Sequence, residues 1–189
     1  PNVEFKGFTV DFNNRLFSFV PGAFSVNPAG KILDCVFENC KSGRVKSVFF
    51  IQITAGVSPV FSNCVFRNIQ THYRSSVVYV NSAAAHPVFS HCKFQDLTCA
   101  QYFTYGTFHT AVGSATLRNC LFLRCQNHQD MHNGTYRSAT IHGNATTYIE
   151  NCSIIDCSFR GAAYESDDGL VWAELSGPII KTASVVNTL

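Results

Sequence analysis

The sequence carries little charge and lacks any long apolar run. Of its 189 residues 14% are Asp, Glu, Lys or Arg, and the formal net charge is +2. Bulk electrostatics therefore gives no reason to expect binding to nucleic acid or to an anionic membrane. No run of apolar residues approaches the roughly 20 that a membrane-spanning helix needs. We expect neither a nucleic-acid partner nor a membrane span.

We expect neither a secretory leader nor a capping segment within residues 1–189. The chain opens directly in repeat material, and its closing segment is a further copy of the opening one, with no amphipathic helix at either end. We expect residues 1–189 to form one uncapped domain of a longer chain or of an assembly. Uncapped strand edges expose unpaired backbone groups, so we expect self-association through the ends.

What the chain does contain is one motif that recurs throughout. Its clearest copy is Pro-Val-Phe-Ser-Asn-Cys-Val-Phe, residues 59–66. When the cysteine is taken as the anchor, successive anchors are 27, 29, 28, 28, 32 and 31 residues apart. The anchor positions are Phe8, Cys35, Cys64, Cys92, Cys120, Cys152 and Ala183. A period in this range predicts a solenoid.

Two apolar rows flank the anchor. Three residues before it stand Phe5, Ile32, Phe61, Phe89, Leu117, Ile149 and Ile180. Two residues after it stand Val10, Phe37, Phe66, Phe94, Phe122, Ile154 and Val185. A step of two keeps side chains on one face of a strand, whereas a step of three does so only if the backbone bends. The pattern predicts a corner just before the anchor.

The residues at that corner have the right chemistry. The position before the anchor is occupied by Gly7, Asp34, Asn63, His91, Asn119, Asn151 and Thr182. Gly, Asn and Asp tolerate left-handed backbone angles, and the short polar side chains can bond to neighbouring groups. We predict a corner ladder of Asp34, Asn63, His91, Asn119 and Asn151. Five residues after the anchor we expect another inward row, with Cys40, Ile69, Leu97, Cys125 and Cys157.

A third strand is expected in each repeat. Runs rich in β-branched and aromatic residues follow a loop of variable length, at 23–26, 48–53, 77–80, 108–112, 139–142 and 170–173. Three short strands per repeat predict an all-β fold of about seven coils of 27–32 residues. A β-sandwich also alternates short strands with turns, but it does not need one corner repeated at a near-constant period.

This pattern resembles the right-handed parallel β-helix of the pectin-lyase-like superfamily, and the resemblance extends over the whole chain. The Asn-Cys-x-Phe repeats are most similar to the repeat regions of large surface or extracellular β-helix proteins. The resemblance implies a fold and not an activity, because this architecture carries lyases, hydrolases, adhesins and inert stalks.

Eight of the nine cysteines occupy the two inward rows. Cysteine packs well as a small buried hydrophobe, so we expect a stack of free thiols at Cys35, Cys64, Cys92, Cys120 and Cys152, beside stacked Phe37, Phe66, Phe94 and Phe122. A disulfide from Cys125 or Cys157 to a neighbour is the alternative. Cys99 is off the pattern and is expected in a loop. With no CxxC pair, we expect the rows to bind no metal.

Three sequons favour a secreted glycoprotein. They are at Asn133, Asn144 and Asn151, where loops and corners should be exposed. Asn133 is the best acceptor because its loop is long, whereas Asn151 is also required by the predicted corner. With the repeat type, the sequons place the expected compartment outside the cell or at its surface.

The strongest enzymatic signal is the loop containing Glu165, Asp167 and Asp168. The resemblance implies acid–base or calcium-binding roles for such carboxylates. The Asn-Thr-Asp, Gly-His-Gly and Arg-Ile-Lys elements of polygalacturonases are absent from this sequence, and an Asp-Asp-Gly turn also has a purely structural explanation. A polysaccharide lyase or glycoside hydrolase is therefore the second hypothesis.

Two further segments suggest ligands. His128, Asp130 and His132 have a spacing that can chelate a divalent ion, although no fourth ligand is evident. The aromatic segment 101–109, with Tyr102, Phe103, Tyr105 and Phe108, could stack on sugar rings or cover the flank of the solenoid. The leading hypothesis remains a non-catalytic structural rod of a stalk, adhesin or filament, without cofactors, with N-linked glycans and a polysaccharide as the other candidate partners.

Overall fold

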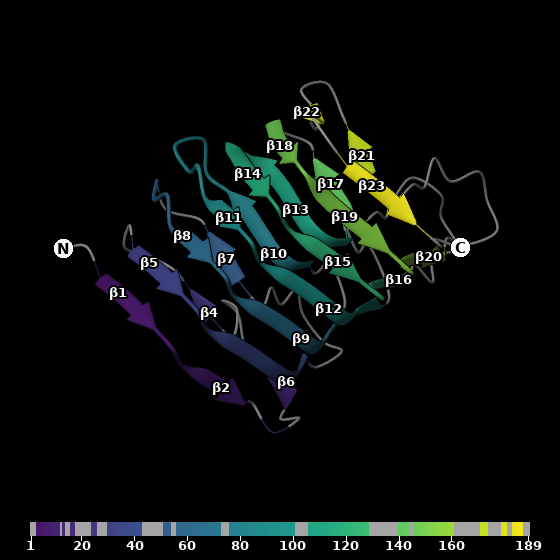
Figure 1. Ribbon diagram of the computed structural model, residues 1–189, viewed down its shortest axis with the longest axis horizontal. Coiled ribbons are helices and arrows are strands. Elements are labelled where there is room, and N and C mark those ends of the chain that lie inside the picture. Colours follow the sequence, from purple (N-terminus) through teal and green to yellow (C-terminus); the bar gives the residue numbers. More distant parts are fainter. Residues whose placement is uncertain are drawn as a thin grey trace.

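The fold is a parallel β-solenoid. The computed structural model describes residues 3–11, 13, 16–17, 24–25, 30–42, 51–53, 56–72, 76–100, 106–128, 140–143, 146–160, 171–173, 179–180 and 183–186. All strand pairings among these residues are parallel, and they form three sheets. Figure 1 shows the strands side by side, with the colours progressing along the stack from purple to yellow. The predicted all-β parallel solenoid is confirmed.

The first sheet contains the strand that precedes each anchor. Its order is β1 (Val3–Lys6), β5 (Gly30–Leu33), β8 (Val60–Ser62), β11 (Val88–Ser90), β14 (Ser114–Arg118), β18 (Thr146–Glu150) and β22 (Ile179–Ile180). The apolar row three residues before the anchor is in register through all seven strands, from Phe5 and Ile32 to Ile149 and Ile180.

The second sheet contains the strands that follow the anchor. Its main order is β2 (Thr9–Asp11), β6 (Val36–Ser42), β9 (Val65–His72), β12 (Lys93–Ala100), β15 (Leu121–Leu123), β19 (Cys152–Ile155) and β23 (Ala183–Val186). Beside this path lie β3 (Leu16–Phe17), β16 (Gln126–His128) and β20 (Ser158–Arg160). The second apolar row is in register from Val10 to Val185.

The third sheet is built from the runs expected as third strands. Its order is β21 (Val171–Ala173), β17 (Ile141–Gly143), β13 (Gly106–Val112), β10 (Ser76–Asn81), β7 (Ile51–Ile53) and β4 (Phe24–Ser25). Gly113, with a φ of 93°, turns the chain from β13 into β14. A Cβ at Gly113 would lie 2.2 Å from the carbonyl oxygen of Ser82, so only glycine fits at this turn.

The core is the space between the three sheets. Inward side chains of every sheet are buried there, including Phe61, Phe66 and Phe108, each with no exposed surface. Burying a phenylalanine of this kind contributes about 1.5–3 kcal/mol, so the aromatic rows are a large part of the stability. The alternation of buried and half-buried positions in β7, β8 and β11 is what strands with one face on a core require.

The structure corrects three local expectations. Cys99 is not in a loop: it lies in β12 and is fully buried. Phe108 lies in β13 in the core and is therefore not available to stack on a sugar ring. The segment after Cys125, expected to be irregular, begins with β16, which pairs with β12 and β20.

Candidate functional site

The first corner of each coil is a left-handed turn held by a polar ladder. Asp34, Asn63, His91, Asn119 and Asn151 have φ angles of 54°, 53°, 54°, 52° and 51°. Left-handed angles are uncommon outside glycine and are most readily adopted by Asn and Asp. The odd step in the apolar pattern is thus taken up by one left-handed residue per coil, at the position that the sequence indicated.

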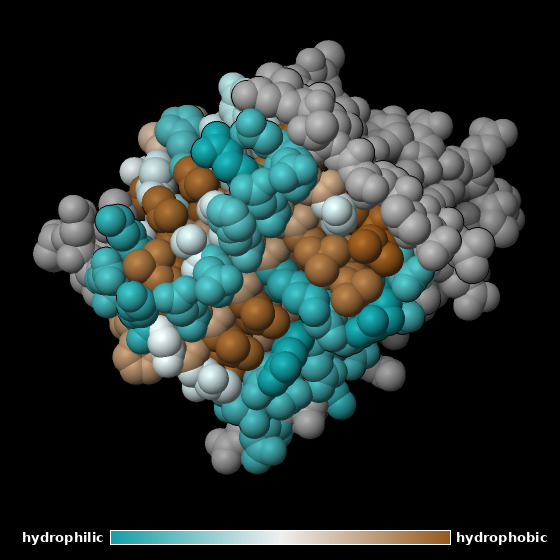
Figure 2. Space-filling model, in the orientation of Figure 1, coloured by the Kyte–Doolittle hydropathy of each residue, from teal (hydrophilic) through white to brown (hydrophobic). Residues whose placement is uncertain are grey.

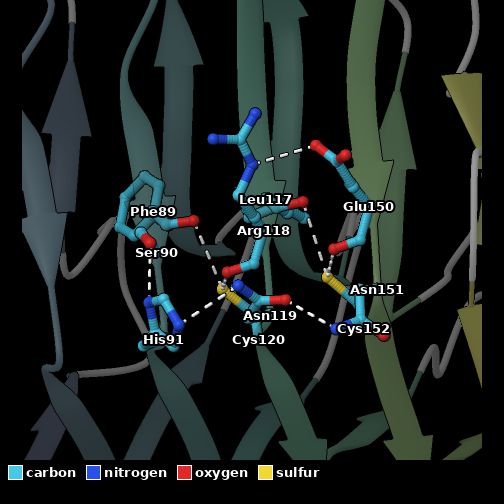
Figure 3. Close-up of polar contacts among 10 residues, drawn as sticks. All are labelled: Phe89, Ser90, His91, Leu117, Arg118, Asn119, Cys120, Glu150, Asn151 and Cys152. Carbon is cyan, nitrogen blue, oxygen red and sulfur yellow. Dashed lines mark hydrogen bonds and ion pairs between the residues drawn. The ribbon is translucent and has the colours of Figure 1, made fainter.

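The corner side chains bond along the axis of the solenoid. Asn63 donates from Nδ2 to Oδ1 of Asp34 at 2.8 Å, and Asn151 donates from Nδ2 to Oδ1 of Asn119 at 2.6 Å. Nδ2 of Asn119 lies 3.1 Å from Nε2 of His91 (Figure 3). The Oγ of Ser90 lies 2.8 Å from the other ring nitrogen of this histidine. These contacts link successive coils on the exposed edge.

A second left-handed corner was missed by the sequence analysis. It lies four residues after the anchor, at Asn39, Asn68, Asp96, Arg124 and Asp156, with φ angles of 58°, 52°, 53°, 51° and 50°. Asn68 donates to Asn39 at 2.6 Å, and Asn39 donates to Asp11 at 3.0 Å. The signal was available, because the step from the second to the fifth position after the anchor is also odd.

The two corners use the same four-residue unit. An inward apolar residue, an outward residue, a left-handed residue and a second inward residue follow one another at each corner, as in 61–64 and again in 66–69. The unit thus occurs twice within nine residues in the coils anchored by Cys35, Cys64, Cys92, Cys120 and Cys152, and the cysteine-rich positions are the last residues of both copies.

The inward cysteines have a specific role at the corners. The thiol of Cys64 donates to the carbonyl oxygen of Ile32 at 3.3 Å, one coil earlier, and that of Cys92 lies 3.5 Å from the carbonyl of Phe61. At the second corner the Cys125 thiol lies 3.5 Å from the carbonyl of Phe94. A carbonyl oxygen has two lone pairs, so a carbonyl within a strand can accept a hydrogen bond from a thiol as well as one from a backbone N–H. Cysteine supplies a weak donor in a side chain that packs as a hydrophobe.

All nine cysteines are buried and free. Burial raises the pKa of Cys40 to about 12 and that of Cys99 to about 11. The pKa of Cys125 is also raised well above its ordinary value, first by burial and then by its neighbour Cys157. The thiolate is the reactive form of cysteine, so these three thiols are poor nucleophiles. Their positions and their chemistry are those of core side chains.

Phenylalanine rings form two stacks inside the solenoid. Phe37, Phe66, Phe94 and Phe122 stack with centroids 5.2, 5.0 and 4.7 Å apart and interplanar angles of 5°, 15° and 7°. In the neighbouring row Phe61 and Phe89 stack at 4.5 Å. Edge contacts such as Phe61–Phe66 at 6.0 Å join the rows. Aromatic contacts of this kind add about 0.5–1.5 kcal/mol each beyond area burial.

The third sheet carries a row of aromatic and polar residues in register. Tyr79, His109, His142 and Trp172 follow one another on adjacent strands. The rings of Tyr79 and His109 have centroids 5.2 Å apart, and those of His109 and His142 are 4.8 Å apart. His109 and His142 are both buried, so a ligand at the surface does not reach their rings.

Ion pairs connect outward residues of neighbouring coils. Arg118 and Glu150 lie 2.9 Å apart, and Arg124 contacts both carboxylate oxygens of Asp96, at 2.6 and 3.0 Å. The hydrogen bond from Arg124 lowers the pKa of Asp96. The Asp96 contact holds the left-handed Arg124 in place. Among the outward side chains Figure 2 shows apolar patches separated by polar rows on the face in view.

The end of the solenoid formed by β1 and β2 exposes its apolar rows. Phe5 is 46% exposed and Phe8 is 56% exposed, whereas Ile32 and Cys35, one coil later, are each 2% exposed. A hollow of about 290 Å³ lies at this end, lined by Phe5, Phe8, Thr9, Val10, Ile32, Cys35 and Phe37. The lining is almost entirely apolar. The core columns thus reach the surface here.

Most of the residues considered as chemical sites lie outside the described residues. These are Glu165, Asp167, Asp168, Asp130, His132, Tyr102, Phe103, Tyr105, Asn133 and Asn144. His128 is at the end of β16. Asn151 is exposed and its Nδ2, the atom that a glycan would occupy, donates to Asn119. The described residues therefore do not bring the candidate carboxylates or metal ligands together.

Over the described ranges, no group of three or more His, Cys, Asp or Glu residues is arranged to hold a metal ion. In the same part of the chain, no helix has the length and apolar character of a membrane span. No family model matches the sequence, and no match is found among curated proteins or among solved structures.

Proposed function

We propose that the protein is a non-catalytic structural rod with a β-helix of the right-handed, pectin-lyase-like type. It serves outside the cell or at its surface, in a stalk, adhesin or filament. N-linked glycans at Asn133 and Asn144 belong to the same proposal. Catalysis on a polysaccharide by Glu165, Asp167 and Asp168 is the activity against which the proposal is tested.

The proposal rests mainly on the observation that the specialised side chains form contacts along the solenoid axis, from one coil to the next. Corner amides, thiols and phenyl rings each contact their equivalents, or the backbone, one coil away. Specialised residues are therefore used to bind coil to coil along the axis. In a repeat protein, stability is approximately the sum of repeat terms and nearest-neighbour interface terms, so strong contacts between coils stiffen the whole stack.

Buried free thiols are compatible with an oxidising compartment. Disulfides are common in secreted proteins because exposed thiols oxidise there. In this chain all nine thiols are buried, and the pKa values of Cys40 and Cys99 are raised by burial. Oxidation follows thiolate character and exposure, so burial protects all nine thiols and the raised pKa further protects Cys40 and Cys99.

The enzymatic alternative is tested with polysaccharide substrates. The purified chain is incubated with a panel of uronate polysaccharides, with and without calcium, and new reducing ends and unsaturated products are measured. We expect none above a heat-denatured sample. Product release that disappears in Asp168→Ala, while a Ser166→Ala control retains it, would refute the structural assignment.

The compartment is tested separately. Antibodies against the chain are applied to intact and to permeabilised cells of the source. We expect labelling of intact cells, in a pattern of stalks or filaments under immunogold electron microscopy. Labelling that requires permeabilisation would exclude the surface role.

A further inference from the structure

We propose that the stacked anchor thiols bind soft monovalent cations of the copper(I) and silver(I) type, each ion held between the sulfur atoms of two successive coils. The thiols concerned, called the thiol column below, are those of Cys64, Cys92, Cys120 and Cys152. The inference goes beyond the structural role proposed above and does not depend on it.

The four thiols of the column have the same orientation. Each contacts two carbonyl oxygens, one two residues earlier in its own coil and one in the preceding coil. For Cys120 these are the carbonyls of Arg118 and Phe89, both at 3.4 Å (Figure 3). The distances at the other three thiols are 3.3 to 3.5 Å. Because the strands that follow these cysteines pair in register, equal orientation aligns the sulfur atoms along the solenoid axis.

The thiols of the column also interact with one another. Side-chain hydrogen bonds join Cys64 to Cys92, Cys92 to Cys120 and Cys120 to Cys152. Equivalent atoms on neighbouring coils are separated by the distance between strands, about 4.8 Å. A disulfide requires its two Cβ atoms to be about 3.8 Å apart. The spacing of the coils therefore keeps neighbouring thiols in contact without favouring a disulfide.

An ion with two ligands fits this spacing. Metal–thiolate bonds are about 2.3 Å long, so two sulfur atoms on opposite sides of one ion are about 4.6 Å apart. Copper(I) and silver(I) accept two sulfur ligands in a line, and thiolates are the side chains that select soft ions. Zinc requires four ligands in a tetrahedron. A two-coordinate site does not need the group of three or more ligands that is lacking among the described residues.

The surroundings of the column suit a monovalent cation. Carbonyl oxygens lie beside every sulfur atom, and these oxygens carry partial negative charge. Exchange of one thiol proton for one monovalent ion leaves the net charge of the core unchanged, which avoids the cost of burying a charge. The corner residues before Cys92 and Cys152, His91 and Asn151, are exposed. Local opening of a corner would therefore give an ion access to the sulfur atoms.

One more pair of thiols has the same arrangement, and two further thiols do not. The backbone N–H of Cys125 donates to the sulfur of Cys157 at 3.4 Å, and the two side chains also interact. Cys40 and Cys99 are equally buried. The residues opposite these two on neighbouring strands are Ile69, Thr71 and Asn127. Cys40 and Cys99 therefore provide a control for buried thiols outside any pair.

The test compares two double variants of the reduced 189-residue chain. Cys64→Ala/Cys120→Ala leaves no two neighbouring thiols in the column, whereas Cys40→Ala/Cys99→Ala removes the same number of buried thiols and keeps every pair. Each folded chain is incubated with silver(I) nitrate in chloride-free buffer. Gel filtration with excess free cysteine then removes silver from isolated thiols. Native mass spectrometry counts the ions retained, and X-ray absorption gives the number of sulfur atoms around each ion.

The unaltered chain and Cys40→Ala/Cys99→Ala should retain equal amounts of silver, with two sulfur atoms around each ion. Cys64→Ala/Cys120→Ala should retain about a third of that amount, at the pair of Cys125 and Cys157. Alanine is already the anchor at Ala183, so circular dichroism should show that this variant is folded. Cys64→Ser/Cys120→Ser keeps a donor for the carbonyl oxygens and should show the same loss of silver, because a hydroxyl is a poor ligand for a soft ion.

Four results would overturn the proposal. They are equal retention of silver by the two alanine double variants, silver bound by one sulfur atom or by more than two, no silver retained by the folded unaltered chain, and full retention by the serine variant. The last result would show that the alanine variant loses silver through a change in its fold and not through the loss of sulfur ligands.

Discussion

Replacing Asn119 separates two contributions of the corner ladder to the free energy of unfolding: the left-handed backbone conformation and the side-chain hydrogen bonds. Asn119 has a φ of 52°, accepts a hydrogen bond from Asn151 at 2.6 Å and contacts Nε2 of His91 at 3.1 Å. An alanine at a left-handed angle costs about 1 kcal/mol or more. Each lost side-chain bond at this half-buried edge costs about 0.5 kcal/mol. Asn119→Ala should therefore lower the free energy of unfolding by about 2 kcal/mol.

Two further variants separate the backbone contribution to this loss of free energy from the side-chain contribution. Asn119→Gly loses the same side-chain bonds but accepts the left-handed angle, so it should cost less than Asn119→Ala, by about 0.5–1 kcal/mol. Arg118→Ala is the matched control. It removes the exposed ion pair with Glu150 at 2.9 Å, and exposed pairs contribute about 0–1 kcal/mol.

The measurement is urea unfolding monitored by far-ultraviolet circular dichroism. The slope of the free energy of unfolding against urea concentration is compared among the variants, to exclude changes in the unfolded state. For a chain of this length, a loss of 2 kcal/mol corresponds to a fall in melting temperature of about 4–8 °C. If Asn119→Ala is no less stable than Asn119→Gly, the left-handed corner is not the source of the effect. If Arg118→Ala is as damaging as Asn119→Ala, the ladder has no special role.

Three further outcomes are expected. Phe66→Ala should cost about 3–5 kcal/mol in urea unfolding, because Phe66 is fully buried and stacks on Phe37 and Phe94; a stability equal to that of the unaltered chain would contradict this packing. Gly113→Ala should prevent folding or lower the melting temperature strongly, since its Cβ would lie 2.2 Å from a carbonyl oxygen, and a native-like melting temperature would contradict this geometry. Burial raises the pKa of Cys40 from 9.0 to about 12 and that of Cys99 from 9.0 to about 11. The free energy of unfolding should therefore fall as the pH rises from about 9 through these values. If urea unfolding showed no pH dependence between pH 8 and 11, these thiols would not be buried.

The fold could be predicted because the clearest patterns in the sequence, the spacing of the anchors and of the apolar residues around them, follow directly from the stacking of coils. The anchor spacing and the apolar rows before and after it are consequences of stacking, and they give the first two sheets and their register directly. The third strands could be located because runs such as 77–80 and 108–112 are rich in β-branched and aromatic residues. The corner was predictable at Asn63 and Asn119, since few other residue types adopt that conformation.

The second corner was missed for a physical reason. Its residues include Arg124, which rarely adopts a left-handed angle by itself and is held here by Asp96. Cys99 was misassigned because the anchor pattern has no place for it, although the strand β12 is long enough to bury it.

The constant nine-residue stretch with its two corners has a consequence for how such a chain can vary. Among the coils anchored by Cys35, Cys64, Cys92, Cys120 and Cys152, whose anchors are 28 to 32 residues apart, all differences in length fall outside that stretch. Peptides could be inserted on the remaining side of the coil without disturbing the left-handed turns, the thiol–carbonyl bonds or the ring stacks. The outline of one flank can therefore differ between related molecules while the axial repeat stays the same.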